Sequence, residues 1–376
     1  MRISILDPGL AELRGHHFDL DRRLVCALSR RGHEVAVHGY VQPIPELSAA
    51  AEEAGFSVRP TFRVFPYHRL PEGQPAYDTY RTLIRMTAED LGRVPVADVW
   101  FWPTLVAYQL MAALSVPAPA PARQVGGVWW TPRFPVPIGG RWWAAAARRL
   151  AQTPGAFTVG AYDKWARDHH RSFSPGMNIS LAPTPHDGAV RTHRSSGLQR
   201  IGFFGYQRVE RGVDLVPQLV DALLRRGFEV VVQDSGGSLQ RAAQNARLVT
   251  LPFVSDFAAE IAKCDMVVWP SLWQAYIGNP SGVVSECIAT GVPVILPAGC
   301  VPADIAVRFG CGIFFHDLSA DSILEAVDEA NDHFPEILSR AEKAARAWRA
   351  VNGTERLADW IETQSRRSAR GLQARA

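Results

Sequence analysis

The residues best suited to chemistry in this 376-residue chain follow a short apolar run at residues 201–204. Gly205 ends that run, and Arg208 and Arg211 come next, ahead of a segment whose apolar residues have helical spacing. Glycine lets the backbone approach a phosphate closely, helix N–H groups face an anion, and arginine donates paired charge-assisted hydrogen bonds. The spacing therefore suits a diphosphate, and a tight turn with solvated arginines is the alternative for the same pattern.

A longer pattern of strand, loop, helix and strand follows in the same half. An apolar run at residues 266–270 ends in Pro270, and Ser271 follows it at the start of a polar loop. A segment carrying Glu286 comes next and runs into Thr290-Gly-Val-Pro-Val294. In order and spacing, the pattern resembles the donor-binding core of the family 4 glycosyltransferases and their GT-B relatives. The resemblance is specific between residues 201 and 296 and weak in the first half of the chain.

The resemblance implies a site for a nucleoside diphosphate sugar of the UDP or GDP type. Glu286 matches the glutamate that accepts hydrogen bonds from the donor ribose. Arg208 and Arg211 match the basic pair that neutralises the diphosphate leaving group. The match is imperfect, because the family usually has arginine immediately after the turn glycine, and this chain has Tyr206 after Gly205.

Two further groups of residues take donor roles by the same resemblance. The loop ahead of the Glu286 helix presents backbone N–H groups to the donor phosphates. The residues of this loop are Asn279, Pro280, Ser281 and Gly282. The nucleotide base packs against Phe253 and Val254, for which an ordinary place in the core is the alternative.

One departure from the family pattern concerns the mechanism. Family 4 members typically carry two glutamates eight positions apart, and Gly278 stands where the first would be. Asn279 is the candidate that replaces its hydrogen bond to the donor sugar, and a surface loop without a catalytic part is the alternative. The resemblance implies retention at the anomeric centre. No acidic metal-binding motif is recognisable, so we expect transfer without a metal or another cofactor.

The first half of the chain offers acceptor-side chemistry in its first loop. Gly15 precedes His16 and His17 where GT-B enzymes bring a glycine loop against the donor phosphates. A histidine there donates to phosphate or handles the acceptor proton, because its pKa suits proton transfer near neutral pH. The sequence does not choose between the two histidines, and a solvated or capping histidine is the alternative. Trp129 and Trp130 are candidates for stacking an acceptor sugar or for simple burial.

Two α/β halves must position these residues. Residues 3–6 predict a buried strand, residues 18–31 an amphipathic helix and residues 34–38 a second strand, which together open a doubly wound parallel sheet. Further strands are expected at 98–102, 124–128 and 156–159. The second half repeats the pattern, with strands at 200–205, 229–233, 247–251, 266–270 and 293–296 and helices at 213–226, 256–263 and 282–290.

A proline-rich, polar stretch from residue 182 to about residue 199 separates the halves. We expect an α/β protein of the GT-B type, with two facing Rossmann-like domains and a cleft between them. The first domain is expected at residues 1–188 to bind the acceptor, and the second at 189–350 to bind the donor. The resemblance implies that a helix within residues 351–376 crosses back to the first domain before a basic tail.

Composition sets limits on partners and location. Forty basic and thirty-seven acidic residues leave a net charge of +3, too small to indicate nucleic-acid binding. The five cysteines form no CxxC pair, which predicts reduced thiols and no zinc. We expect a soluble, cytoplasmic protein, because no apolar stretch suits a signal peptide or a membrane span. Arginines and tryptophans at 133–149 fit a peripheral contact with the inner face of a membrane, or a solvated helix with inward-packed tryptophans.

These features predict a glycosyltransferase that moves a sugar from a nucleoside diphosphate sugar to a small-molecule, glycan or lipid-linked acceptor. A sugar-nucleotide epimerase on the same frame is one alternative, because it consumes the same donor without an acceptor. A GT-B protein that binds a nucleotide sugar and transfers nothing is the other.

Overall fold

The computed structural model divides the chain into two compact units. The first consists of Met1–Pro185 and Thr354–Ala376, and the second of His186–Gly353, so the chain passes between them twice. The domain limits expected at residues 188 and 350 lie close to these crossings. The described residues are 1–13, 16–66, 76–116, 123–129, 139–153, 155–191, 196–205, 209–234, 237, 239, 245–252, 254 and 256–373.

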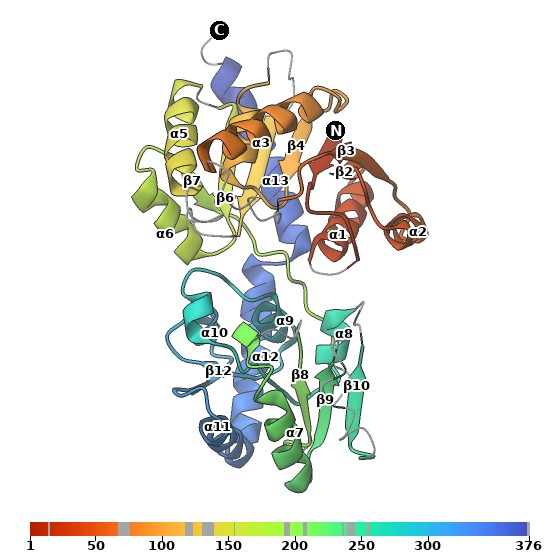
Figure 1. The fold of residues 1–376 in the computed structure, drawn as a ribbon, viewed down its shortest axis with the longest axis vertical. Helices are drawn as coiled ribbons and strands as arrows, with labels where there is room; N and C mark the ends of the chain where they lie inside the picture. The colour runs from red at the N-terminus through yellow and green to blue at the C-terminus, as the bar shows by residue number, and fades with distance from the viewer. Residues whose placement is uncertain are drawn as a thin grey trace. The chain divides into compact units, whose positions relative to one another are not determined.

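In its described part, the first unit has a parallel sheet of seven strands in the order β3-β2-β1-β4-β5-β6-β7 (Figure 1). The strands are β1 (Arg2–Leu6), β2 (Glu34–Tyr40), β3 (Val58–Phe62), β4 (Val99–Trp102), β5 (Arg123–Val128), β6 (Phe157–Ala161) and β7 (Ile179–Leu181). The helices are α1 (His17–Arg30), α2 (Pro45–Glu53), α3 (Ala76–Leu91), α4 (Ala107–Ala113), α5 (Gly139–Gln152), α6 (Lys164–Phe173) and α13 (Thr354–Gln373). The strand order reverses between β1 and β4, where sheets of this kind bind ligands.

Strand β4 shows how the sequence covers both faces of this sheet. Val99 and Phe101 pack in a cluster with residues of α1 and α13. Trp100 and Trp102 pack in a different cluster with residues of α3, α4 and α5. Because side chains alternate between the faces of a strand, a strand covered on both faces is apolar at every position. The run at 99–102 meets that requirement.

The second unit repeats the plan, with six strands among its described residues in the order β10-β9-β8-β11-β12-β13. The strands are β8 (Arg200–Phe203), β9 (Glu229–Gln233), β10 (Leu248–Leu251), β11 (Met266–Val268), β12 (Val294–Pro297) and β13 (Gly312–Phe315). The helices are α7 (Val216–Arg225), α8 (Phe257–Ile261), α9 (Gly282–Thr290), α10 (Val301–Phe309), α11 (Ala320–Asp332) and α12 (Phe334–Val351). The strand order reverses between β8 and β11. The α/β class and the two Rossmann-like sheets predicted from the sequence are confirmed.

Helix α7 begins later than the sequence predicts, at Val216 rather than at Val213. Val209–Arg211 form a 3₁₀ turn, and further turns continue to Leu215. Proline lies in the first turn of α7, where its missing N–H is tolerated. The helix expected at residues 213–226 is therefore wrong at its start, because residues 213–215 form turns.

Helix α13 packs within the first unit. A Cβ on Gly160 of β6 would lie 2.5 Å from Cζ2 of Trp360, so the helix lies directly on that strand. At the surface, Arg31, which directly follows α1, pairs with Glu355 and Asp359, each at 2.7 Å. Exposed ion pairs stabilise little, so the close packing on β6 holds the helix more than these pairs do.

The tryptophans of residues 133–149 that the structure describes are buried. Trp142 stacks on Tyr80 with ring centroids 5.1 Å apart, and Trp143 meets His170 edge-on at 4.5 Å. The inward-packed interpretation is thus confirmed for these two side chains, whereas residues 133–138 lie outside the described part. Within the described ranges, no helix has the length and apolar character that crossing a membrane requires.

Candidate functional site

The Gly205 turn lies at the carboxyl end of β8, at the reversal point of the second sheet. Gly205 has a φ of +107°, and its N–H donates to Oε1 of Gln233 over 2.9 Å. A Cβ at this position would lie 2.1 Å from Nη1 of Arg211 and 3.2 Å from Cγ2 of Val283. Only glycine leaves room here for the guanidinium group of Arg211. The contact with Val283 also places the Gly205 turn beside the first turn of α9.

Two further contacts fix Arg211. Its Nε donates to the hydroxyl of Tyr276 over 3.0 Å, and Tyr276 packs edge-on against Trp269 at 4.5 Å. Gly212, with a φ of +62°, follows directly, and a Cβ there would lie 2.1 Å from the carbonyl oxygen of Pro270. The turn that carries Arg211 is therefore held against the end of β11, and its cation lies at the carboxyl edge of the sheet.

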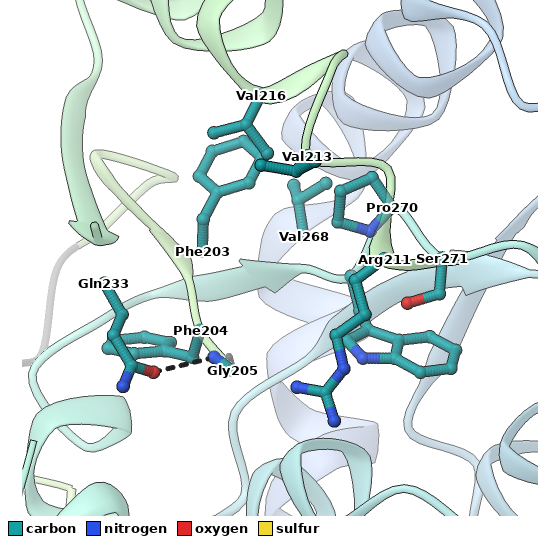
Figure 2. A pocket seen from close by; sticks show the side chains of 11 residues that line it. Phe203, Phe204, Gly205, Arg211, Val213, Val216, Gln233, Val268, Pro270 and Ser271 are labelled. Atoms are coloured by element: carbon teal, nitrogen blue, oxygen red, sulfur yellow. Dashed lines mark hydrogen bonds between the residues drawn. The ribbon is translucent and has the colours of Figure 1, made fainter. Parts of the chain in front are cut away.

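A pocket opens at this edge between the ends of β8, β9 and β11. Figure 2 shows Arg211 extending toward the Gly205 turn, with the hydrogen bond between Gln233 and Gly205 drawn beside it. The pocket is lined by Phe203, Phe204, Gly205, Arg211, Val213, Val216, Gln233, Val268, Trp269, Pro270 and Ser271. Its lining combines apolar side chains with a few polar groups at the reversal point of the sheet, which is where sheets of this kind bind ligands.

The loop ahead of α9 lies where the sequence predicts it. Ser281 caps the helix and accepts a long hydrogen bond of 3.5 Å from the backbone N of Val284. Gly282 is exposed, while Pro280 is half-buried. Asn279 is half-buried and donates from Nδ2 to the carbonyl oxygen of Ala275 over 3.4 Å. An exposed glycine at a helix start leaves the backbone N–H groups there accessible to an anion.

Glu286 lies on the same helix and is buried, with 6% of its surface exposed. Its Oε1 is 2.7 Å from Nδ1 of His186, and its Oε2 accepts from the backbone N of Gly188 over 3.1 Å. Both partners belong to the segment where the chain enters the second unit. Sequence reasoning missed His186, although it lies in the polar stretch assigned to the linker.

Three residues of the predicted donor site, and one of the two acceptor-side tryptophans, cannot be placed. Gly15, Arg208, Phe253 and Trp130 lie outside the described residues. Val254, the second residue expected at the base, is half-buried. The described part of the donor site thus consists of Gly205, Arg211, the loop ahead of α9 and Glu286.

In the first unit, the two candidate histidines differ in their burial and in their contacts. His17 is buried, and its Nδ1 lies 2.6 Å from Oδ2 of the fully buried Asp7. A Cβ on Gly9 would lie 2.3 Å from the His17 ring, so the ring covers that glycine. His16 is half-buried and stacks on His17 with centroids 4.2 Å apart. Asp21 of α1 is also fully buried. Burial, and then the charge of Asp7, raise the pKa of Asp21 well above its ordinary value.

This group of polar residues follows β1, at the carboxyl edge of the first sheet. When a carboxylate is ionised it only accepts hydrogen bonds, and a contact of this kind with Asp7 then places the proton of His17 on Nδ1. Trp129 is buried nearby, packs against Tyr162 at 4.2 Å and donates from Nε1 to the carbonyl oxygen of Pro103 over 3.2 Å. The burial interpretation of Trp129 is confirmed.

Among the residues that the structure describes, no three His, Cys, Asp or Glu side chains are grouped so as to hold a metal ion.

No protein-family model and no curated protein sequence matches the chain. Solved structures do. Sucrose-phosphate synthase from Thermosynechococcus elongatus has a TM-score of 0.68 at 11% identity, with 100% of each chain covered. A glycosyltransferase from Rickettsia africae has a TM-score of 0.68 at 10% identity, with 98% of each chain covered. HepE from Anabaena, in complex with UDP and glucose, has a TM-score of 0.64 at 13% identity, with 99% of each chain covered. These likenesses extend over both units and show that the chain has the GT-B fold.

Proposed function

We propose that the chain is a glycosyltransferase that moves a sugar from a nucleoside diphosphate sugar to a nucleophile of an acceptor. The observation that carries the proposal is the position of Arg211, held at a glycine turn on the reversal point of the second sheet. The exposed start of α9 lies beside the same turn, through Val283. A fixed cation and helix N–H groups that converge on one point are what a diphosphate requires.

Two solved structures of the same fold support the class of donor. HepE from Anabaena is in complex with UDP and glucose, and the glycosyltransferase VinC is in complex with DTDP. VinC has a TM-score of 0.61 at 15% identity, with 98% of this chain covered. The Arg211 turn and the start of α9 lead us to assign the nucleotide to the second unit.

In the proposed reaction, the bond between the anomeric carbon and the diphosphate oxygen breaks, and its electron pair stays on the diphosphate. Arg211, Arg208 and the N–H groups of Ser281 and Gly282 stabilise the negative charge that develops there. The acceptor oxygen forms the new bond to the anomeric carbon and loses its proton. Asn279 is the candidate hydrogen-bond donor to the transferred sugar.

We assign the acceptor mainly to the first unit, at the carboxyl edge of its sheet. With its proton fixed on Nδ1 by Asp7, neutral His17 has Nε2 as its acceptor, which suits proton handling. His16, which is less buried, is the candidate for a hydrogen bond to a phosphate. The pH profile of kcat/KM for His17→Gln and His16→Gln variants tests this division, since only loss of the proton acceptor should remove the pH dependence of transfer.

Two finer features belong to the proposal. Retention of the anomeric configuration follows the family resemblance, and independence from metal ions follows from the sequence, in which no acidic metal-binding motif is recognisable. NMR of the product anomer tests the first. Activity that is lost in a chelator and restored by manganese would contradict the second.

The experiment that tests the donor site is a calorimetric screen of UDP, GDP and TDP and of their sugars. Native protein is compared with Arg211→Ala and Glu286→Ala. We expect one diphosphate to bind and both substitutions to weaken it. Binding that ignores both residues would refute the donor site. An epimerase would instead convert the bound sugar nucleotide with no acceptor present, which product analysis detects.

A further inference from the structure

The segment by which the chain enters the second unit is fixed to α9 residue by residue. Besides the two contacts to Glu286, the backbone N of Ala189 donates to Oγ1 of Thr290 over 3.2 Å. Nε1 of Trp348 donates to the carbonyl oxygen of His186 over 2.8 Å. A Cβ on Gly188 would lie 2.4 Å from the backbone of Ala289, so the segment lies directly against the helix.

The contacts to Glu286 have a defined polarity. The backbone N of Gly188 is a donor, and an ionised carboxylate only accepts, so Nδ1 of His186 carries its proton toward Oε1. The segment thus supplies one donor to each carboxylate oxygen. Two fixed donors of this kind orient the carboxylate plane.

The same histidine lies at the start of α9. Its Cε1 and Nε2 are 3.5 and 3.8 Å from the point that a Cβ on Gly282 would occupy. Gly282 is the exposed helix start assigned to the donor phosphates, and Glu286 lies one turn further along the helix. The His186 ring therefore lies beside both Gly282, where the phosphates are expected, and Glu286, where the ribose is expected.

We propose that His186 is a positioning residue of the donor site, which orients Glu286 through Nδ1 so that its carboxylate accepts the donor ribose hydroxyls. The segment from His186 to Gly188 is then a working part of the nucleotide site. This inference rests on the proposed function, because it takes a nucleoside diphosphate as the ligand of α9.

The test uses two polar substitutions that keep different nitrogens. His186→Asn places an amide nitrogen near the position of Nδ1, and His186→Gln places one near Nε2 only. Calorimetry gives the Kd of UDP, GDP and TDP and of the 2′,3′-dideoxy form of each, for the native chain and both variants. The ratio between each diphosphate and its dideoxy form reports the ribose contact alone, because base and phosphates are unchanged.

For the native protein and His186→Asn, we expect the dideoxy form to bind at least about tenfold more weakly, as befits lost hydrogen bonds to a charged group. For His186→Gln, the ratio should fall toward one, with the dideoxy Kd itself little changed. His33→Gln is the matched control, because Nε2 of His33 pairs with Glu362 at 2.8 Å in the first unit. That control should leave the ratio unchanged.

Three results would overturn the inference, and they can be told apart. If His186→Gln weakens both forms of the nucleotide equally, or neither, His186 does not act through the ribose contact. If the native protein binds both forms equally, Glu286 is not the ribose acceptor, while the diphosphate site stands. If none of UDP, GDP and TDP binds the native protein, the proposed donor site fails and this inference fails with it.

Discussion

A single methyl group at Gly205 should disable the donor site through Arg211. In the Gly205→Ala variant, the new Cβ would lie 2.1 Å from Nη1 of Arg211 in the present geometry, so the guanidinium must move. Its hydrogen bond to Tyr276 fixes the other side of the group, at 3.0 Å from Nε. The displaced side chain cannot keep that bond and also remain over the turn.

Two separate costs follow from the geometry. A side chain at a φ of +107° costs about 1–2 kcal/mol in the free energy of unfolding. For a unit of this size, that cost lowers Tm by roughly 2–8 °C. Loss of the arginine from a bound phosphate removes a hydrogen bond to a charged group, worth about 1.5–3 kcal/mol. The Kd of a nucleoside diphosphate should therefore rise by roughly 10- to 150-fold.

Calorimetry with the bound diphosphate and thermal unfolding separate these two costs. Gly310→Ala is the matched control, because Gly310 has a φ of +79° and no atom lies within 4 Å of its Cβ position. It should lower Tm by a similar amount and leave Kd unchanged. On an Arg211→Ala background, Gly205→Ala should add no further loss of affinity. Additive losses would refute the view that Gly205 acts by making room for the arginine.

Three other substitutions or treatments have defined outcomes. Because burial and the charge of Asp7 raise the pKa of Asp21 above 3.8, the folded state holds a proton that the unfolded state releases, and stability is lost as pH rises above that value. Asp21→Asn should thus raise Tm at pH 7 and flatten its decline between pH 4 and 7, and an unchanged slope would contradict this. Gly188→Ala, at a φ of +69° and 2.4 Å from the backbone of Ala289, should lower Tm more than Gly310→Ala, whose Cβ meets no atom within 4 Å. Burial raises the pKa of the Cys264 and Cys311 thiols to about 12, and it also raises the pKa of Cys287 and Cys300. A thiol reagent at pH 8 should therefore modify only the exposed Cys26 in the native protein. Rapid modification of all five cysteines would contradict this burial.

The elements around Glu286 could be predicted because their signals are local. Ser281 caps α9, and Gly291 ends it with a φ of +80°, a conformation that glycine adopts freely. The predicted range of residues 282–290 is therefore confirmed. The run at 229–233 is also confirmed as β9, since a strand covered on both faces reads as a continuous apolar run.

The partners of Glu286 and His17 could not be predicted, because they depend on tertiary structure. His186 and Glu286 are 100 positions apart, and only the folded chain brings them within 2.7 Å. Asp7 and Asp21 have residue types that are usually exposed, so composition gave no sign of their burial. The start of α7 was misplaced for a local reason, because the apolar periodicity of residues 213–226 continues through turns that are not helical.

The most direct test of the central claim is sugar transfer itself. The diphosphate that binds is supplied as its sugar nucleotide with an isotope label in the sugar, together with a panel of glycan, lipid-linked and small-molecule acceptors. We predict that mass spectrometry finds label on an acceptor, that free diphosphate appears in equal amount, and that Arg211→Ala loses both. Tight binding of the donor with label on no acceptor, or conversion to an epimeric sugar nucleotide, would contradict the assignment as a transferase.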